Sequence, residues 1–246
     1  MVEDYLNSVL VCNDDGFHSP SLRPLLRYLE SMFRHVVAVV PDSDRSGVAC
    51  SMTVDRPIRV KQPEDGIYTV NGTPVDCVNF AVSELFEGED LDMLISGINA
   101  GHNMANSLLY SGTVGAALHA QQFGIRGICF SANDEDPNWV ENSLSQIMRH
   151  DLVKGFVDPA QCQAKILNIN LPAFETSAEQ QVRITRPAQR QGIKMTAAVD
   201  PYGNAVYWAG KPGDIVESNT LSDYNVLQSG DVSVTPIDAD LSIEMN

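Results

Sequence analysis

Basic residues are scarce in this sequence. Its 246 residues include 16 Lys and Arg against 32 Asp and Glu, so the formal net charge is −16. Proteins that bind the backbone of nucleic acids do so with basic patches, and this composition therefore argues against a nucleic acid polymer as the partner. We attribute the excess of acid to solubility, and we expect that any anion site has to be made favourable locally.

Paired cysteines and long apolar runs are also missing. The five cysteines are scattered and form no CxxC pair, which argues against a disulfide framework or a zinc knuckle and for a reducing compartment. No apolar run approaches membrane-spanning length, and Glu3 and Asp4 stand where a secretory signal would carry basic residues. We therefore predict a cytoplasmic protein with no membrane partner.

Several common motifs of enzymes and nucleotide-binding proteins are absent as well. The sequence contains no GxSxG elbow, no GxxxxGK[ST] loop and no GxGxxG fingerprint. Hydrophobic residues nevertheless make up 43% of the chain, which is ample for a core. The length suits one large α/β domain, or such a domain with an arm.

Strand and helix patterns alternate through the first part of the chain. Residues 9–12 form an apolar run that predicts a strand buried on both faces, and residues 35–40 form a second such run. Between them, leucines at helical spacing predict a helix from Leu22 to Leu29, so the two strands should be parallel with a right-handed crossover. Further strands are expected at 91–95, 127–130 and 166–169, and further helices from Pro74, after Ser111 and at 139–154.

The pattern changes twice along the chain. Residues 52–72 alternate around a Pro-Glu-Asp-Gly turn, which predicts a hairpin at the periphery of the sheet. From about residue 180 only short extended pieces remain, joined by turns rich in Gly, Pro and Asp. We therefore predict an α/β catalytic core at 1–180 and, at 181–246, an extended β-rich arm that serves oligomerisation and completes the sheet.

Polar clusters follow the carboxyl ends of three of the predicted strands. Asp14 and Asp15 follow the first, Ser46 the second and Asn99 the third. In an open parallel sheet the ligand binds at this rim. Two carboxylates with neutral oxygens suit Mg²⁺, Mn²⁺ or Ca²⁺, whereas Zn²⁺ would favour Cys or His. Two carboxylates also roughly cancel the charge of one divalent cation, so the site would not repel a phosphate.

A helix N-terminus is predicted at the same rim. Ser111, Gly112 and Thr113 form an N-cap signature, and the backbone N–H groups and dipole there favour an anion. Asn103, Arg45 and Ser107 are candidates for additional side-chain donors. From the residues alone, we interpret this set as a site for metal-assisted chemistry on a phosphate ester.

Other polar residues have simpler interpretations. Asp42 and Asp44 are expected to be turn or capping residues, and Cys12 a small core residue without a histidine partner. His102 lies within a polar cluster, and for it a functional and a packing role are equally compatible with the sequence.

Five motifs occur in an order that resembles a known family. They are Asn13-Asp14-Asp15-Gly16, Pro41-Asp42-x-x-Arg45-Ser46, Gly72-Thr73-Pro74-x-Asp76-Cys77-Val78, Ser96-Gly97-Ile98-Asn99-x-Gly101-x-Asn103 and Ser111-Gly112-Thr113-Val114. The tail is similar too, from Arg183-x-Thr185-Arg186 to Val232-Ser233-x-Thr235-Pro236. Together these motifs resemble SurE, the stationary-phase survival protein family of metal-dependent 5'/3'-nucleotidases. The chain departs from the family at Cys12, where Ser or Thr is commoner, and ends at Asn246, where many members continue into a further helix.

The resemblance implies a fold, a reaction and a set of ligands. The fold would be a Rossmann-like three-layer core with an arm that exchanges between subunits of a homodimer or homotetramer. Each subunit would hold one divalent cation, Mg²⁺ or Mn²⁺, and the substrates would be nucleoside 5'- and 3'-monophosphates, with short polyphosphate in some members. The implied metal ligands are Asp14, Asp15, Ser46 and Asn99.

On this basis we assign the remaining roles as predictions. Asp14, Asp15, Asn99 and Asn103 form the catalytic set, and the substrate-binding set is Asn13, Arg45, Ser111, Gly112 and Thr113. The working hypothesis is in-line attack of a metal-bound water on the phosphoryl group, with an aspartyl-phosphate intermediate as the alternative. The rival functions are a nucleotide-sensing module without catalysis and, less compatible with the length, a nucleotide-sugar glycosyltransferase.

Overall fold

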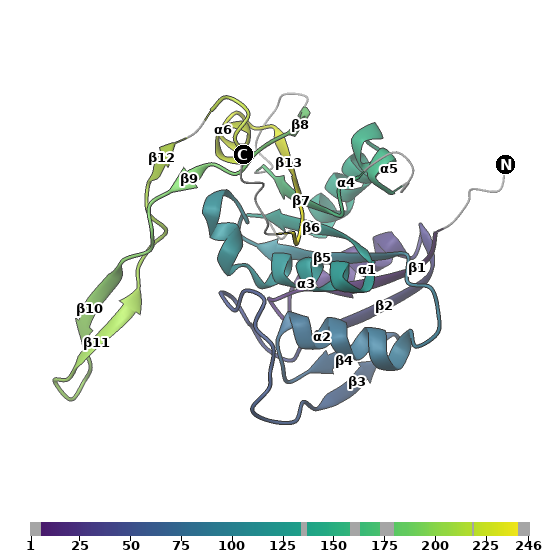
Figure 1. Ribbon diagram of the computed structural model, residues 1–246, viewed down its shortest axis with the longest axis horizontal. Helices are drawn as coiled ribbons and strands as arrows, with labels where there is room; N and C mark the ends of the chain where they lie inside the picture. Colours follow the sequence, from purple (N-terminus) through teal and green to yellow (C-terminus); the bar gives the residue numbers. More distant parts are fainter. Residues whose placement is uncertain (1–5, 134–136, 158–162, 173–179, 218, 241–246) are drawn as a thin grey trace.

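A nine-stranded, mostly parallel sheet forms the centre of the protein (Figure 1). The computed structural model describes residues 6–133, 137–157, 163–172, 180–217 and 219–240. The strand order is β3-β4-β2-β1-β5-β6-β7-β13-β8. These strands are β1 (Leu6–Cys12), β2 (Phe33–Pro41), β3 (Val60–Glu64), β4 (Ile67–Val70), β5 (Met93–Ala100), β6 (Arg126–Ala132), β7 (Ile166–Leu171), β8 (Val182–Ile184) and β13 (Val232–Ile237).

Helices cover both faces of this sheet, which confirms the predicted α/β three-layer architecture. One layer contains α1 (Leu22–Leu29), α4 (Pro137–Met148) and α5 (Asp151–Val157), and the other contains α2 (Pro74–Phe80) and α3 (Gly112–Ala120). Along β1, Val9 and Val11 pack in the first layer, and Leu10 and Cys12 pack in the second. From Val9 to Cys12 the strand is therefore apolar at consecutive positions, because both of its faces are buried there.

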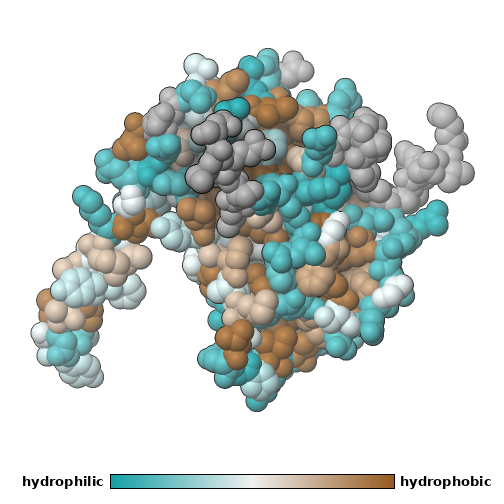
Figure 2. Space-filling view, viewed as in Figure 1, coloured by the Kyte–Doolittle hydropathy of each residue, from teal (hydrophilic) through white to brown (hydrophobic). Residues whose placement is uncertain are grey.

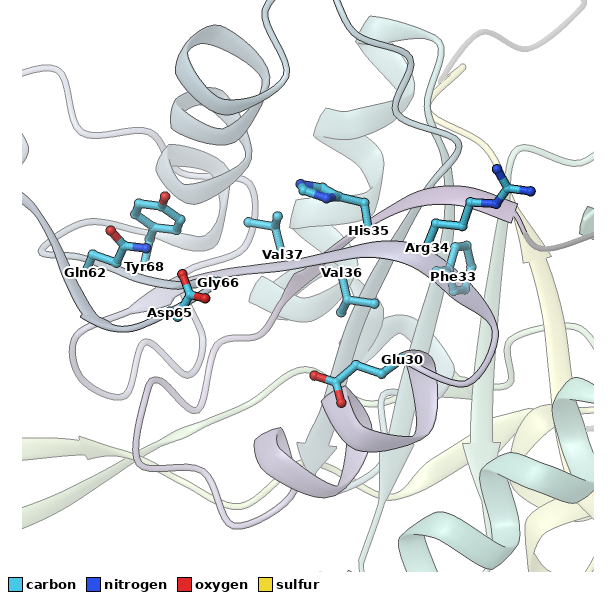
Figure 3. A pocket seen from close by; sticks show the side chains of 10 residues that line it. All are labelled: Glu30, Phe33, Arg34, His35, Val36, Val37, Gln62, Asp65, Gly66 and Tyr68. Carbon is cyan, nitrogen blue, oxygen red and sulfur yellow. The ribbon is translucent and has the colours of Figure 1, made fainter.

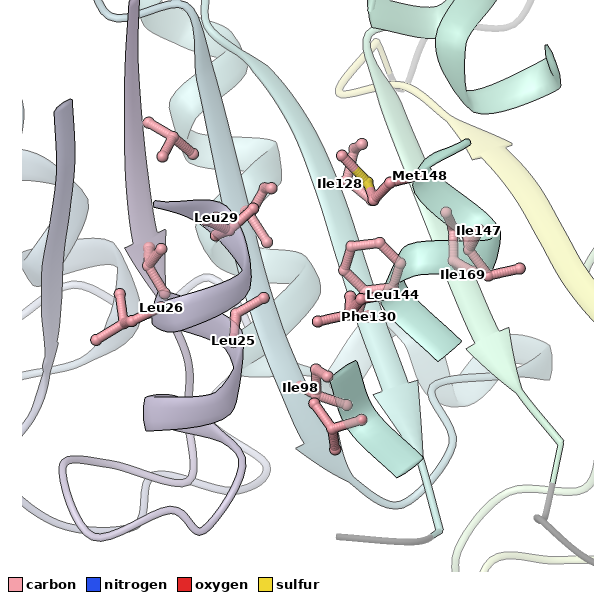
Figure 4. Packing of buried hydrophobic residues seen from close by; sticks show 14 of the residues in the cluster. Leu25, Leu26, Leu29, Ile98, Ile128, Phe130, Leu144, Ile147, Met148 and Ile169 are labelled. Atoms are coloured by element: carbon pink, nitrogen blue, oxygen red, sulfur yellow. The ribbon is translucent and has the colours of Figure 1, made fainter. Parts of the chain in front are cut away.

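The first layer has a continuous apolar core. Leu25 and Leu29 of α1 belong to the same buried cluster as Leu144 of α4 and Phe130 of β6, and Leu144 lies beside Phe130 (Figure 4). These side chains are fully buried, and their packing fixes the strands whose carboxyl ends carry the polar clusters.

Helix boundaries follow the local sequence, with one correction. Thr73 caps α2 in a capping box with Asp76, as the Thr-Pro pair predicts, and a π-helical turn at Ala81–Leu85 continues that helix. The single helix expected at 139–154 is wrong, because α4 ends at Met148 and α5 begins at Asp151. His150 separates them: its carbonyl accepts the N–H groups of Val153 and Lys154, and its ring accepts that of Leu152.

The later strands divide between the sheet and a projecting arm. β13 pairs antiparallel with β7 and parallel with β8, so these two strands complete the sheet. The arm consists of β9 (Gln189–Arg190), β10 (Met195–Val199), β11 (Ala205–Ala209) and β12 (Ile215–Glu217). Helix α6 (Asp223–Gln228) follows it. Figure 2 shows the arm standing clear of the body, with apolar side chains among its visible residues.

The predicted hairpin at 52–72 is present but shorter. β3 and β4 pair antiparallel, and β4 also pairs parallel with β2, so the hairpin forms one edge of the main sheet. Residues 52–59 lie outside any strand and carry exposed side chains such as Val54.

Candidate functional site

Residues from three strand ends line one cavity at the carboxyl rim of the sheet. Its volume is about 240 Å³, and Asp14, Ser46 and Asn99 are all part of its wall. The strands that deliver them are neighbours, because β1 lies between β2 and β5. The sequence predicted that these side chains would meet, and the structure brings them to the same cavity.

Asp14 lies at the base of this cavity and faces the N-terminus of α3. Its carboxylate accepts the hydroxyl of Thr113 and, at 3.2 Å, the backbone N–H of Gly112. Its side chain is only 3% exposed, and burial raises the pKa of the carboxyl even though these hydrogen bonds act to lower it. Burial therefore outweighs the hydrogen bonds, and a cation bound beside this carboxylate would stabilise its ionised form.

Close packing requires glycine at the first position of α3. A Cβ at Gly112 would lie 2.8 Å from the Cβ of Asp14 and 2.9 Å from its Oδ2. The absence of a side chain there lets the helix end approach the carboxylate directly.

Asp15 lies beside the Asn99 segment. Its Oδ2 accepts the backbone N–H of Ala100 at 3.2 Å, which ties the β1 turn to the end of β5. Strand β5 runs further than expected, from Met93 to Ala100, so Asn99 belongs to the strand itself. The amide of Asn99 donates to the carbonyl of Gly101 at 2.6 Å, and its Oδ1 remains the atom suited to a cation.

Ser46 comes from the turn after β2. Its hydroxyl and its N–H both donate to Asp44 Oδ1 at 2.7 Å, so the hydroxyl oxygen keeps its lone pairs. Asp44 thus shapes the turn, as the sequence indicated. The turn is also tied to β1, because the N–H of Arg45 donates to the carbonyl of Asp14 at 2.7 Å.

The donor set fits a hard divalent cation. The cavity wall offers the carboxylate of Asp14, the hydroxyl of Ser46 and the amide oxygen of Asn99, which are ligand types of Mg²⁺ and Mn²⁺. Asp15 is not part of that wall; its carboxylate lies next to Ala100, which is. Within the described ranges, no group of three or more His, Cys, Asp or Glu side chains is placed to hold a metal. Any cation bound here would therefore depend on the neutral oxygens of Ser46 and Asn99 as well as on the acids.

Two predicted substrate contacts are directed elsewhere in the structure. The Arg45 guanidinium donates to the carbonyl of Gly72 at 3.0 Å and to Asp42 at 3.1 Å, and Arg45 is not part of the cavity wall. The side chain of Asn13 is fully buried and exchanges hydrogen bonds with the backbone of Gly16, so it closes the β1 turn.

The N-terminus of α3 has a divided role. Ser111 lines the cavity, and its hydroxyl accepts the N–H of Val114 at 3.1 Å as the helix cap. Gly112 and Thr113 direct their donors at Asp14. The predicted anion site at this helix end therefore faces a carboxylate of the protein itself.

The opposite wall of the cavity is the segment after β5. From this segment His102, Asn103, Ser107 and Tyr110 line the cavity, and Gly47 of the turn after β2 and Ala100 of β5 line it as well. The sequence patterns did not single out Tyr110, Gly47 or Ala100. Tyr110 directly precedes the cap residue Ser111, and this adjacency was the available signal. Asn103 is 8% exposed, and its amide donates to the hydroxyl of Ser131 at 2.9 Å.

His102 has a fixed orientation in this wall. Its Nε2 lies 2.7 Å from the carbonyl of Leu171, so Nε2 carries the proton and Nδ1 is the acceptor nitrogen of the neutral ring. Burial lowers the pKa of His102 below the usual range, although the bond to Leu171 acts to raise it. His102 thus brings no positive charge to the cavity near neutral pH.

A second, larger cavity lies at the other end of the sheet. Its volume is about 430 Å³, and it is formed by the start of β2 and the turn between β3 and β4 (Figure 3). Its polar lining residues are mostly exposed, and Glu30 and His35 lie on opposite sides of the β2 ribbon in Figure 3. The rim cavity at the carboxyl ends is therefore the stronger candidate.

Known proteins share both the sequence and the fold of this chain. Residues 9–194 match the family described as Survival protein SurE. The chain is 35% identical over 236 residues to 5'-nucleotidase SurE of Vibrio vulnificus strain YJ016, covering 95% of this chain and 90% of that protein. It is 37% identical over 239 residues to 5'-nucleotidase SurE of Neisseria meningitidis strain FAM18, covering 96% and 94%.

A solved structure agrees with these relatives. The crystal structure of the SurE protein from Aquifex aeolicus has a TM-score of 0.79 and 32% sequence identity, covering 96% of this chain and 94% of that one. The family match over residues 9–194 spans all five ordered motifs. This chain therefore belongs to the SurE family.

Proposed function

We propose that this protein is a divalent-metal-dependent nucleotidase that hydrolyses nucleoside 5'-monophosphates, and also 3'-monophosphates, to the nucleoside and phosphate. Its relatives in Vibrio and Neisseria are named 5'-nucleotidases. The observation that carries the proposal is the meeting of Asp14, Ser46 and Asn99 in one cavity beside the N-terminus of α3. Short polyphosphate is included as a further substrate to be tested.

The proposed ligands of the cation are Asp14, Asp15, Ser46 and Asn99. When bound, Mg²⁺ or Mn²⁺ would polarise a phosphoryl oxygen and lower the pKa of a bound water. Asp14 is held for this role by Thr113 and Gly112, and Asp15 is held by Ala100. Each carboxylate is therefore oriented by backbone groups before any ligand arrives.

The remaining cavity residues would bind the phosphoryl group. Asn103 and Ser111 present polar side chains to the cavity, and Asn99 adjoins both the proposed metal site and that wall. We assign Asn99 and Asn103 to the stabilisation of charge that develops on the phosphoryl oxygens. Arg45 and Asn13 keep a supporting role, since their side chains hold the turns that carry Ser46 and Asp14.

The arm is proposed to join two or more subunits. Large apolar and aromatic side chains of the arm are exposed to solvent: Tyr202 is 91%, Val199 70% and Trp208 68% exposed. Exposed apolar side chains gathered in this way are typical of a protein–protein interface. Within the predicted segment 181–246, β9–β12 form the projecting arm. A homodimer or homotetramer through this arm, with the catalytic core at 1–180, would bury this surface. The molar mass in solution, measured by light scattering, tests the assembly.

A cytoplasmic location remains part of the proposal. Cys12, Cys50, Cys77 and Cys129 are free thiols, as expected in a reducing compartment. Among the described residues no helix is long and apolar enough to cross a membrane. Cell fractionation tests this assignment directly.

Phosphate release decides the activity. The purified protein is incubated with a panel of nucleoside 5'- and 3'-monophosphates and short polyphosphate, with Mg²⁺, Mn²⁺ or chelator. We expect release of phosphate that requires the divalent ion and stops with chelator. Nucleotide binding without any release would instead identify a nucleotide-sensing module.

A further inference from the structure

A buried carboxylate joins the cavity wall to the base of the arm. Asp223, at the start of α6, is fully buried. Its Oδ2 accepts the backbone N–H of Ala105 at 2.7 Å, and its Oδ1 accepts that of Ala188 at 2.9 Å. Ala105 lies between the cavity residues Asn103 and Ser107, and Ala188 directly precedes β9 of the arm.

The cavity segment has a backbone conformation that requires support. Ala105 has φ of 54° and is fully buried, and this left-handed region is unfavourable for a residue with a Cβ. Its N–H is the group that Asp223 accepts. The carboxylate therefore stabilises a conformation that the local sequence disfavours.

Other contacts attach the same segment to the C-terminal half. The carbonyl of Asn103 accepts the side-chain amides of Asn168 and Asn170, at 2.8 and 2.9 Å. Asn106 exchanges two hydrogen bonds with the backbone of Arg190 in β9. These bonds keep the segment attached when a single contact is removed, so a variant at Asp223 should still fold.

We propose that Asp223 is a positioning residue of the nucleotidase reaction: through Ala105 it holds segment 103–107 in the geometry that places Asn103 in the cavity. This inference rests on the proposed function of that cavity. Asp223 itself is not part of the cavity wall. Its effect on turnover would be indirect, and a displacement of about 1 Å at a catalytic group can lower the rate by on the order of 100-fold.

The substitution Asp223→Asn is designed to remove the hydrogen bond to Ala105 and to keep the one to Ala188. The remaining oxygen can still accept the N–H groups of Ala188 and Tyr224, and the new NH₂ group then faces the N–H of Ala105, where two donors cannot bond. The matched control is Asp231→Asn. Asp231 also accepts a backbone N–H, that of Gln181, but it touches β8 rather than the cavity segment.

Two readouts are measured with Mn²⁺ and a nucleoside monophosphate. In Asp223→Asn we expect kcat to fall by about tenfold or more, with KM within about twofold, and hydrogen–deuterium exchange to rise in the peptide 101–110. In Asp231→Asn we expect both readouts to match the wild type. The folded fraction, from circular dichroism and thermal unfolding, is used to normalise kcat.

A rescue variant distinguishes positioning from general damage. Glycine adopts positive φ readily, so Ala105→Gly in the Asp223→Asn background should restore most of kcat, because the segment no longer needs the carboxylate to hold its conformation. If the loss of kcat came instead from the lost support of Ala188, Ala105→Gly would not restore it.

Three results would overturn the proposal. They are wild-type kcat in Asp223→Asn, unchanged exchange in the peptide 101–110, and a loss of kcat that Ala105→Gly leaves uncorrected. If the wild type itself releases no phosphate from any substrate, the proposed function fails. The exchange comparison then still decides whether Asp223 holds the segment.

Discussion

Replacing Asp14 by asparagine should abolish turnover and leave the metal-free protein at least as stable as the wild type. The fold should tolerate asparagine at this position, because its amide oxygen can accept the N–H of Gly112. Its NH₂ group can donate to the Thr113 hydroxyl, which is a donor to Asp14 in the wild type and would become an acceptor in the variant. Activity does not tolerate it, since the proposed metal site loses one of its two carboxylates. Loss of several kcal/mol of charge stabilisation corresponds to at least about 1000-fold in rate.

The sign of the stability effect follows from the Asp14 pKa. Burial raises that pKa, so in the absence of metal the ionised carboxylate is disfavoured in the folded state. The protonated carboxyl group contributes to folding stability. This contribution is fully present below the ordinary Asp pKa and is lost as the pH rises through the raised pKa of the folded state. With chelator present, Asp14→Asn should therefore unfold at the same or a higher temperature than the wild type near neutral pH, and the difference should narrow in acid.

Metal addition should reverse this order. At 100 times its dissociation constant, a ligand that binds only the folded state adds about 2.7 kcal/mol, which for a domain of this size corresponds to roughly 5–10 °C in Tm. We expect this rise with Mn²⁺ in the wild type and not in Asp14→Asn.

Differential scanning fluorimetry with chelator and with Mn²⁺, together with phosphate release, makes this comparison. The matched control is Asp92→Asn, because Asp92 accepts the N–H groups of Asn7 and Ser8 at the opposite end of the sheet. It should keep both turnover and the response of Tm to Mn²⁺. Two results would refute the assignment of Asp14 as a metal ligand. They are turnover in Asp14→Asn within tenfold of the wild type, and a wild-type Tm that does not change with millimolar Mn²⁺.

Three other substitutions test separate parts of the structure. Gly112→Ala would place a Cβ 2.8 Å from that of Asp14, so we expect a loss of about 1–3 kcal/mol in denaturant unfolding and at least tenfold lower phosphate release; wild-type values for both would contradict the close packing. Asp76→Asn tests the α2 cap: burial acts to raise the pKa of Asp76, but hydrogen bonds from Thr53 and Thr73 lower it overall, so the stability it provides is present above the ordinary Asp pKa and lost in acid. The variant should lose about 1–3 kcal/mol in urea unfolding at pH 7 and approach the wild type as the pH falls toward 3, whereas a constant difference would exclude the linkage. Trp208→Ser should weaken association through the arm and lower the molar mass measured by light scattering, and an unchanged mass would place the subunit interface elsewhere.

The strands and their ends could be predicted from the sequence because each is marked by a few consecutive residues. An apolar run followed by polar residues marks a strand and its exit, and the rule that parallel strands open at one rim then brings Asp14, Ser46 and Asn99 together. The same reasoning located α2 from Thr73 and Pro74. Whether these residues hold a metal stays a prediction, since their roles depend on a ligand and not on their positions alone.

The contacts that hold the cavity wall could not be predicted, because their partners are far apart in the chain. Asp223 and Ala105 are 118 residues apart, and Asn168 and Asn103 are 65 apart. The sequence predicted only short extended pieces after residue 180, so neither α6 nor a role for Asp223 at its start was expected. Arg45 illustrates the converse: its position beside Ser46 indicated a substrate contact, but the loop before α2 places Gly72 where its guanidinium donates.

From the charges around the cavity we predict that binding of the proposed nucleotide substrate requires a divalent ion. No Lys or Arg is among the cavity-wall residues in the described part of the chain, and the Arg45 guanidinium pairs with Asp42. His102 is uncharged near neutral pH because burial lowers its pKa, and the N-terminus of α3 already faces Asp14. A phosphate approaching a protein of net charge −16 thus meets no free positive group of the cavity wall itself. Calorimetry with an inert nucleoside monophosphate analogue should detect binding with Mn²⁺ and none with chelator, and equal affinity in both conditions would show that the phosphate is held by protein donors alone.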